Sequence, residues 1–251
     1  MPTSRQRPHS ALGILLSVAL ALSLWAGANW VCGSRLVPSP LRVSRELATL
    51  LLDGATWRHL CLTLFRGSAG LAIAAALAFV VGIPCGLSRR AMAVVSPLVS
   101  MVQSCPPIVW ISLLLVWAST GATVPVLVVI ASAFPPLFSS ISHAVVSMDS
   151  DLLGMARVYR IPRWSVLRHI LLPGVSRHAL GAFSFALGVT WKVTATAEFF
   201  GADSGVGSRI YWAYRLLDMP RLFGWTLLVI LVGLALEWCL IQPMRGGGES
   251  S

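Results

Sequence analysis

The chain has 251 residues, of which 56% are hydrophobic and 11% are charged, and its mean hydropathy is +0.79. A soluble domain of this composition could not cover itself with polar groups, so the composition indicates a membrane protein. The 19 basic residues outnumber 9 acidic ones, but they lie in short clusters between apolar runs, which excludes a nucleic-acid-binding platform. Five cysteines without paired spacing give no sign of a disulfide framework or a zinc site.

The apolar runs predict an all-α membrane protein. Each crossing of the bilayer takes roughly 20 helical residues, so about six spans fit and leave no room for a soluble catalytic domain. The first run, Leu12 to Val31, follows a tail with Arg5 and Arg7. Because Ala26-Gly27-Ala28 resembles a cleavage site, a retained first helix and a removed leader are both compatible with it. The stretch from Cys32 to His59 predicts a short amphipathic helix on the outer face.

Three later runs predict spans at about residues 64–87, 178–200 and 223–241. The first of them ends at Arg89-Arg90, a basic pair expected on the cytoplasmic side. Arginines are more frequent in the segments on the amino-terminal side, whereas tryptophans gather at the opposite ends of the spans. With about six spans, this distribution places both termini in the cytoplasm.

Two further spans, at about residues 97–117 and 124–141, each contain a proline pair, Pro106-Pro107 and Pro135-Pro136. Adjacent prolines remove backbone donors and clash with the preceding turn, so we expect these helices to be kinked or broken. Membranes tolerate such breaks where protein or a water-filled path satisfies the freed carbonyls, which predicts a pathway beside them. Simple bending of packed helices is the alternative.

The longest polar connection, between the fourth and fifth spans, predicts a short helix on the inner membrane face. Pro162 suits the first helical position, Trp164, Leu167 and Leu171 follow as an apolar stripe, and Pro173 is expected to close the helix. Arginines flank the stripe. The pattern is compatible with an anchor on the membrane surface or with docking into a groove on a cytoplasmic partner.

Motifs for catalysis are missing from the sequence. No glycine-rich loop ends in Lys-Ser or Lys-Thr, because Lys192 is the one lysine and lies within a span, so we do not expect ATP hydrolysis by this chain. Asp149-Ser150-Asp151 has a spacing that can hold a metal, but two acids at a helix start are also good caps. We expect no metal site.

Two ionisable residues of the fifth span, Lys192 and Glu198, are functional candidates because charges inside a membrane are costly. Their separation of six residues places them on different helix faces. For Lys192, lining of a pathway, pairing with another chain and snorkelling are all open. Glu198 lies near the outer end, where it could reach water or a partner loop.

The sequence resembles the integral-membrane permease subunits of bacterial binding-protein-dependent ABC importers, closest to the sulfonate, nitrate and taurine type. The resemblance covers nearly the whole chain after the first span and rests on the order and spacing of short motifs. These motifs are Thr63-Leu64-Phe65-Arg66, the two proline pairs, the segment from Asp149 to Pro173, Ala197-Glu198 and Gly205-Val206-Gly207.

The resemblance implies the type I ABC importer permease fold with a cytoplasmic coupling-helix loop at about residues 149–173, which would fit into a cleft on an ATPase subunit. Aligned on Leu172-Pro173, the family's Glu-Ala-Ala becomes Gly154-Met155-Ala156, and its loop glycine becomes Arg160. The residues expected to couple to the ATPase are Ala156, Arg157, Arg160, Arg163, Trp164, Leu167, Arg168 and Pro173. The candidates for the pathway are Pro106, Pro107, Pro135, Pro136, Lys192 and Glu198.

The resemblance also implies the assembly and its place in the cell. We expect a homodimer or paired permease in the bacterial inner membrane, surrounded by lipid, with two cytoplasmic ATPase subunits and an external solute-binding protein. ATP and Mg are expected on the ATPase, and no cofactor on this chain. Residues 1–62 are expected to form a tail, the first helix and the external segment, residues 63–243 the permease core, and residues 244–251 a tail.

Two other functions compete with this interpretation. An ion-coupled secondary transporter would use Lys192 and Glu198 as coupling charges, but the two proline pairs lie in adjacent helices and not in corresponding halves of the chain. A membrane scaffold that binds an ATPase without moving a solute is the second alternative, suggested by the altered Glu-Ala-Ala loop.

Overall fold

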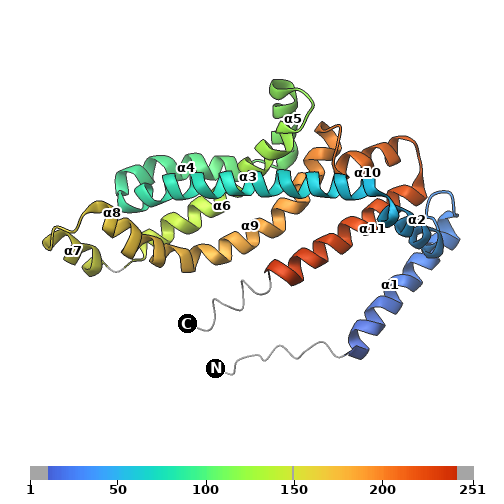
Figure 1. Ribbon diagram of the computed structural model, residues 1–251, viewed down its shortest axis with the longest axis horizontal. Helices are drawn as coiled ribbons and strands as arrows, with labels where there is room; N and C mark the ends of the chain where they lie inside the picture. The colour runs from blue at the N-terminus through green and yellow to red at the C-terminus, as the bar shows by residue number, and fades with distance from the viewer. Residues whose placement is uncertain (1–10, 149, 242–251) are drawn as a thin grey trace.

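A computed structural model describes residues 11–148 and 150–241, and it contains no strand within those ranges. Figure 1 shows helices arranged mostly along one long axis. The helices in chain order are α1 (Ala11–Cys32), α2 (Pro40–Leu52), α3 (Gly54–Leu87), α4 (Arg89–Ser104), α5 (Pro107–Ala118), α6 (Thr123–Val146), α7 (Ser150–Val158), α8 (Arg163–Val166), the π-helix η1 (Leu167–Leu171), α9 (Leu172–Gly201), α10 (Val206–Arg215), α11 (Met219–Leu236) and the π-helix η2 (Glu237–Ile241).

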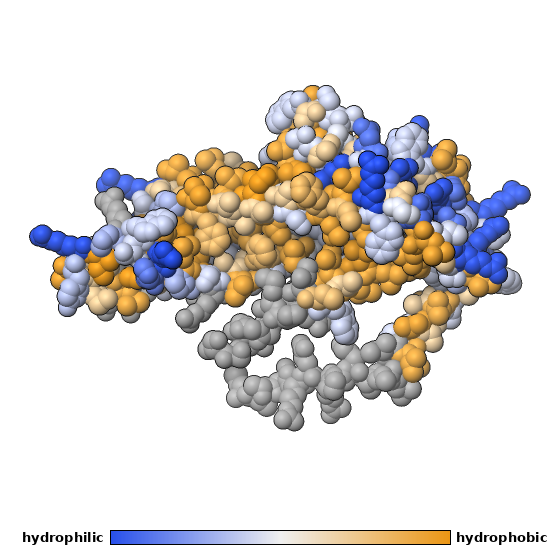
Figure 2. Space-filling view, viewed as in Figure 1, coloured by the Kyte–Doolittle hydropathy of each residue, from blue (hydrophilic) through white to orange (hydrophobic). Residues whose placement is uncertain are grey.

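The lengths and composition of the helices agree with the predicted spans. Among the described residues, four helices are long and apolar enough to cross a membrane, and up to six spans result if each bent pair of helices is one span. Figure 2 shows apolar side chains over the middle of the molecule and hydrophilic ones at both ends of the long axis. This distribution matches a bilayer that surrounds the middle of the bundle.

The helices α3, α6 and α9 form the centre of the bundle, with small residues at their contacts. A Cβ atom on Gly70 of α3 would lie 2.8 Å from the side chain of Val129 on α6, and one on Gly86 would lie 2.6 Å from Val145. Because lipid tails are as apolar as the side chains, helices in a membrane associate through such close packing. The glycines of α3 therefore allow α6 to approach closely at both positions.

The predicted amphipathic helix between the first two spans is confirmed as α2, whose Val43 and Leu50 are buried. Its apolar side covers α11. The first helix, α1, buries none of its apolar window. It is attached near its end by Trp25, whose indole N–H donates to the carbonyl oxygen of Pro38 over 3.1 Å and whose ring stacks on Phe223.

The first proline pair breaks its span as predicted. The helices α4 and α5 meet at 93°, with Pro106 as the N-cap of α5 and Pro107 as its first residue. A proline at this position loses no helical hydrogen bond, since the first N–H groups of a helix have no partner within it. The break thus follows directly from the sequence.

The second pair was expected to kink or break its helix, and of these two outcomes the break does not occur: α6 continues through Pro135 and Pro136 without interruption. The neighbouring side chains Leu137 and Phe138 are fully buried in the main core. Packing against α3 and α9 on both sides keeps α6 helical although two backbone donors are lost.

The fifth span differs from the prediction at its beginning. The expected stop at Pro173 is wrong: α8, η1 and α9 follow one another without a loop, and the segments 164–176 and 179–201 are bent by 59°. The N–H of Leu172 donates to the carbonyl oxygen of Leu167, five residues back. This wider π turn comes directly before the proline, where the ring would otherwise crowd the preceding turn.

Candidate functional site

A helical arm, formed by α7, α8 and the turn between them (residues 150–166), extends from one end of the bundle. Figure 1 shows α7 as the outermost element at that end, beyond the ends of α4 and α6. The arm contains most of the residues that the sequence assigned to ATPase coupling. Its second half is continuous with α9 through η1, so the arm is connected to a central helix of the bundle without a loop.

The turn of the arm has a left-handed residue at its centre. Arg160 has a φ of +50°, and the N–H of Ile161 donates to the carbonyl oxygen of Ala156 over 2.9 Å. This is the hydrogen bond of a Schellman motif, in which glycine is the preferred left-handed residue. Arg160 therefore takes a backbone conformation that glycine adopts more readily, and the turn forms with arginine at this position.

Replacing Arg160 with glycine is expected to stabilise this turn by about 1 kcal/mol, since a side chain in the left-handed region costs roughly that much. The amide of Ile161 should then exchange its hydrogen several-fold more slowly, as measured by hydrogen exchange and mass spectrometry. Arg160→Ala is the control, because it removes the charge and keeps a Cβ. Equal protection in the alanine and glycine variants would contradict the role of the backbone.

The other position that differs from the family pattern is Gly154, and it has free space around it. Nothing lies within 4 Å of a Cβ atom built on Gly154, whereas Ala156 is buried with 3% of its surface exposed. Position 154, the first of the Glu-Ala-Ala motif, therefore has room for a glutamate side chain. Position 156, the last of the motif, has room only for a small residue.

The arm exposes an apolar surface, which we call the arm surface. Trp164 is 69% exposed and Tyr159 is 75% exposed. Among the arm side chains that the structure describes, the exposed large apolar ones are Leu152, Met155, Val158, Tyr159 and Trp164.

The predicted apolar stripe of the inner helix is divided between two environments. Trp164 is exposed, but Leu171 is buried in the main core and Leu167 packs partly buried against it. The leucines thus attach the arm to the bundle. Arg168 and Pro173 are exposed, whereas the side chains of Arg157 and Arg163, together with Asp149, lie outside what the structure describes.

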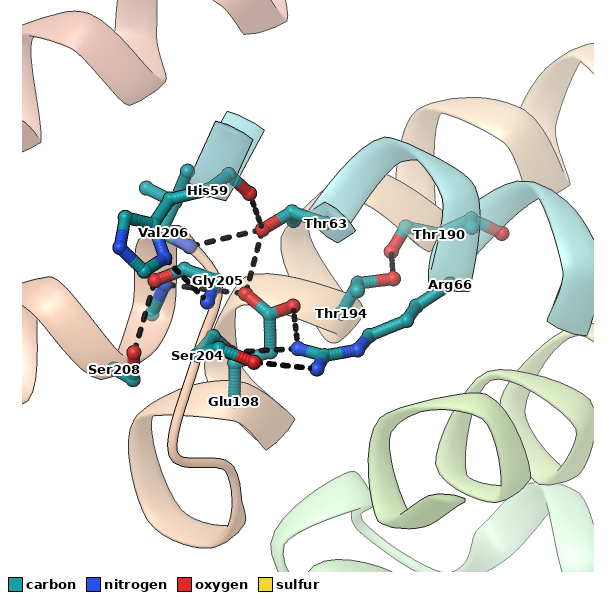
Figure 3. Close-up of polar contacts among 11 residues, drawn as sticks. His59, Thr63, Arg66, Thr190, Thr194, Glu198, Ser204, Gly205, Val206 and Ser208 are labelled. Atoms are coloured by element: carbon teal, nitrogen blue, oxygen red, sulfur yellow. Dashed lines mark hydrogen bonds and ion pairs between the residues drawn. The ribbon is translucent and has the colours of Figure 1, made fainter. Parts of the chain in front are cut away.

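Glu198 lies in a buried polar network at the other end of the bundle (Figure 3). Its carboxylate accepts a hydrogen bond from the guanidinium of Arg66 over 2.8 Å, from the hydroxyl of Thr63 over 2.7 Å and from the amide N–H of Gly207 over 3.2 Å. The side chain of Arg66 is 7% exposed and that of Glu198 is fully buried. A buried ion pair needs such additional hydrogen bonds to offset the loss of hydration.

The same network fixes the loop between α9 and α10. Arg66 donates to both the carbonyl and the hydroxyl oxygen of Ser204, and the N–H of Val206 donates to Thr63 over 2.9 Å. The loop lies so close to α9 that a Cβ on Gly207 would be 2.1 Å from the carbonyl oxygen of Ala195. Glycine is therefore required for this close approach.

These contacts revise the expectation for Glu198. The possibility that it reaches water is wrong, because none of its surface is exposed. The predicted separation of Lys192 and Glu198 on different helix faces is confirmed, since Lys192 is exposed. The partner of Glu198 was missed, although a signal was present: Arg66 is an arginine close to the start of an apolar run, and opposite charges in two spans tend to pair.

The remaining pathway candidates differ in exposure. Pro106, Pro107 and Lys192 are exposed, whereas Pro135 is buried and Pro136 is partly buried between packed helices. Within the described residues, no group of three or more histidine, cysteine or acidic side chains could hold a metal ion.

A bundle of apolar helices long enough to cross a membrane, with an exposed helical arm at one end, defines a helical membrane protein. The chain belongs to the family of binding-protein-dependent transport system inner membrane components, whose profile matches residues 76–240. It is thus a permease subunit of an ABC importer, and the resemblance found in the sequence is confirmed.

Individual relatives and a solved structure agree with this family. The putative aliphatic sulfonates transport permease protein SsuC of Bacillus subtilis (strain 168) is 25% identical over 231 residues, which cover 91% of this chain and 83% of SsuC. The taurine transport system permease protein TauC of Escherichia coli (strain K12) is 27% identical over 244 residues, or 94% of this chain and 87% of TauC. An inward-facing structure of the MetNI methionine ABC transporter shares the fold, with a TM-score of 0.60, 18% identity and coverage of 78% of this chain and 95% of that chain.

Proposed function

We propose that the arm surface docks into a cleft on a cytoplasmic ATPase and transmits the movement of that subunit to the spans. The observation that supports this proposal is the exposed apolar side chain of Trp164 on an arm that continues into α9 without a loop. Apolar anchors in a groove, with basic residues at its rim, are a common way to recognise a partner. A firmly docked arm converts partner motion into rigid-body rocking of helices.

The proposed assembly contains two permease chains in the inner membrane, either identical or paired, with two ATPase subunits on the cytoplasmic side and a solute-binding protein outside. Both termini of this chain lie in the cytoplasm in this arrangement, which agrees with Arg89 and Arg90, the first residues of α4, as a basic pair expected on the inner side. ATP and Mg bind to the ATPase subunits, and this chain binds no cofactor. Lipid surrounds the apolar middle of the bundle.

The proposed solute is a small oxyanion of the sulfonate, nitrate or taurine type. Relatives that match over most of this chain carry names for transport of aliphatic sulfonates and taurine. Lys192, a cation in the apolar part of α9, agrees with an anionic solute.

Reconstitution in vesicles tests the proposal. With the ATPase and the binding protein present, ATP should drive accumulation of solute, and the loaded binding protein should stimulate ATP hydrolysis. Vesicles that bear only this chain should accumulate none. Accumulation by the chain alone would identify an ion-coupled carrier, and an ATPase that binds the chain without any solute flux would identify a scaffold; either result would refute the proposal.

A further inference from the structure

A cavity of about 330 Å³ lies between α9 and α11. Its walls are mostly apolar, with Leu187 and Leu234 among them, and three side chains with polar atoms complete the lining: Trp191, Lys192 and Glu237. Cavities of this size that combine apolar walls with a few polar groups are typical of sites for small molecules.

Trp191 supplies an unused hydrogen-bond donor in this cavity. The side chain is 6% exposed, and its indole N–H has no hydrogen-bond partner. Buried indole N–H groups normally find a partner, so this donor requires an explanation. The Nε1 atom lies 3.5 Å from the position that a Cβ on Gly233 would occupy, so the glycine of α11 leaves space beside the N–H.

Lys192 supplies a cation to the lining of this cavity. It is exposed on α9 and forms no ion pair within the described residues. The nine residues that separate it from the end of α9 at Gly201 correspond to about 14 Å of helix, which is too far for a lysine to snorkel to that end. An ammonium within a membrane span is costly and is by default a functional candidate.

We propose that this cavity binds the anionic head group of a small organic acid, such as an alkanesulfonate, between the ammonium of Lys192 and the indole N–H of Trp191. The apolar walls then cover the short carbon chain of the solute. Glu237 lies in the same lining, and the head group is placed on the side of Lys192 and Trp191, where the cation and the donor are. This inference rests on the proposed transport function and assigns to it a binding site within the spans.

Equilibrium binding to the full-length chain, purified with its ATPase in lipid nanodiscs, tests the site. Radiolabelled ethanesulfonate is added without nucleotide and without binding protein, and saturable binding is expected. Lys192→Met and Gly233→Ala should each weaken it about tenfold or more, as the loss of a hydrogen bond to a charged group does. Alanine at position 233 fits at an ordinary contact distance, so this variant should fold normally while it covers the indole N–H.

Three controls accompany the measurement. Lys192→Arg keeps the charge and should retain binding, as should Thr196→Val, which alters the exposed residue one turn from Lys192 outside the cavity. Nitrate has the charge without a carbon chain and should bind about tenfold more weakly than ethanesulfonate.

Several results would overturn the inference: no saturable binding by the natural chain, equal binding by Lys192→Met, or equal affinity for nitrate and ethanesulfonate. A loss of permease pairs in Lys192→Met with unchanged binding would show instead that the lysine pairs with a second copy. Recovery of the ATPase with the chain is measured on the same samples, so failure of this site is distinguishable from failure of the proposed function.

Discussion

Glu198→Ala is expected to destabilise the chain by about 3–5 kcal/mol, the usual effect of removing one partner of a buried ion pair. The variant leaves the guanidinium of Arg66 buried without its carboxylate, and it also removes the acceptor for Thr63 and Gly207. The measurement is thermal unfolding of the purified chain in detergent, followed by tryptophan fluorescence. Asp203→Ala, an exposed acidic residue of the neighbouring loop, is the control and should change little.

A double variant separates the ion pair from simple loss of packing. Arg66→Met combined with Glu198→Gln removes both charges and keeps most of the volume, so it should recover part of the stability lost in Glu198→Ala. The physical reason is that the cost arises from the unpaired buried cation. If the double variant is no more stable than Glu198→Ala, the network acts through packing and the role assigned to the ion pair is wrong.

Helices and their approximate places could be predicted because spans in lipid have a simple sequence signature. The long apolar runs became α1, α3, α6 and α11, and Pro106-Pro107 broke its span as expected. These features depend on local properties of the chain, namely the length of an apolar run and the missing donors of two prolines.

The errors occurred where tertiary packing decides the outcome. Pro135-Pro136 has the same local chemistry as the first pair, yet α6, which packs on α3 and α9, stays continuous. Pro173 is likewise accommodated, by the π turn that precedes it. No local pattern distinguishes these prolines from ones that break a helix.

The polar network could be predicted only in part. The motifs that contain Arg66, Glu198 and Gly207 were recognised as fragments in a fixed order, but pairing across 132 residues between Arg66 and Glu198 requires the fold. Glycines at positions 205 and 207 are explained in the same way, since the loop passes directly over α9. The division of the stripe into an exposed Trp164 and a buried Leu171 also needed the structure, because helical spacing alone places both on one face.

Trp164→Asp is expected to weaken attachment of the ATPase by about thirtyfold or more. Large aromatic side chains at the centre of an interface commonly contribute 2 kcal/mol or more, and a carboxylate would in addition be buried in the partner's groove. Trp164 is 69% exposed in the isolated chain, so the change should leave the fold intact. The measurement is co-purification of the ATPase, quantified against the amount of permease.

Trp238→Asp provides the matched control for this prediction. Trp238 is 66% exposed, close to the value for Trp164, but it lies in η2 and outside the arm. Its variant should retain the ATPase, because only the arm surface is proposed to dock. Equal loss in both variants would show a general effect of a new charge and would contradict docking through the arm.

Leu167→Ala separates attachment from transmission, since Leu167 packs against the core of this chain and not on the arm surface. The variant should keep the ATPase bound while solute-stimulated ATP hydrolysis falls. With looser packing between the arm and the bundle, movement of the ATPase bends the chain at this position and no longer moves the spans as a rigid body. A variant with both attachment and stimulation unchanged would show that movement reaches the spans by another route. Loss of attachment in Leu167→Ala with retention in Trp164→Asp would reverse the assigned roles of the two residues.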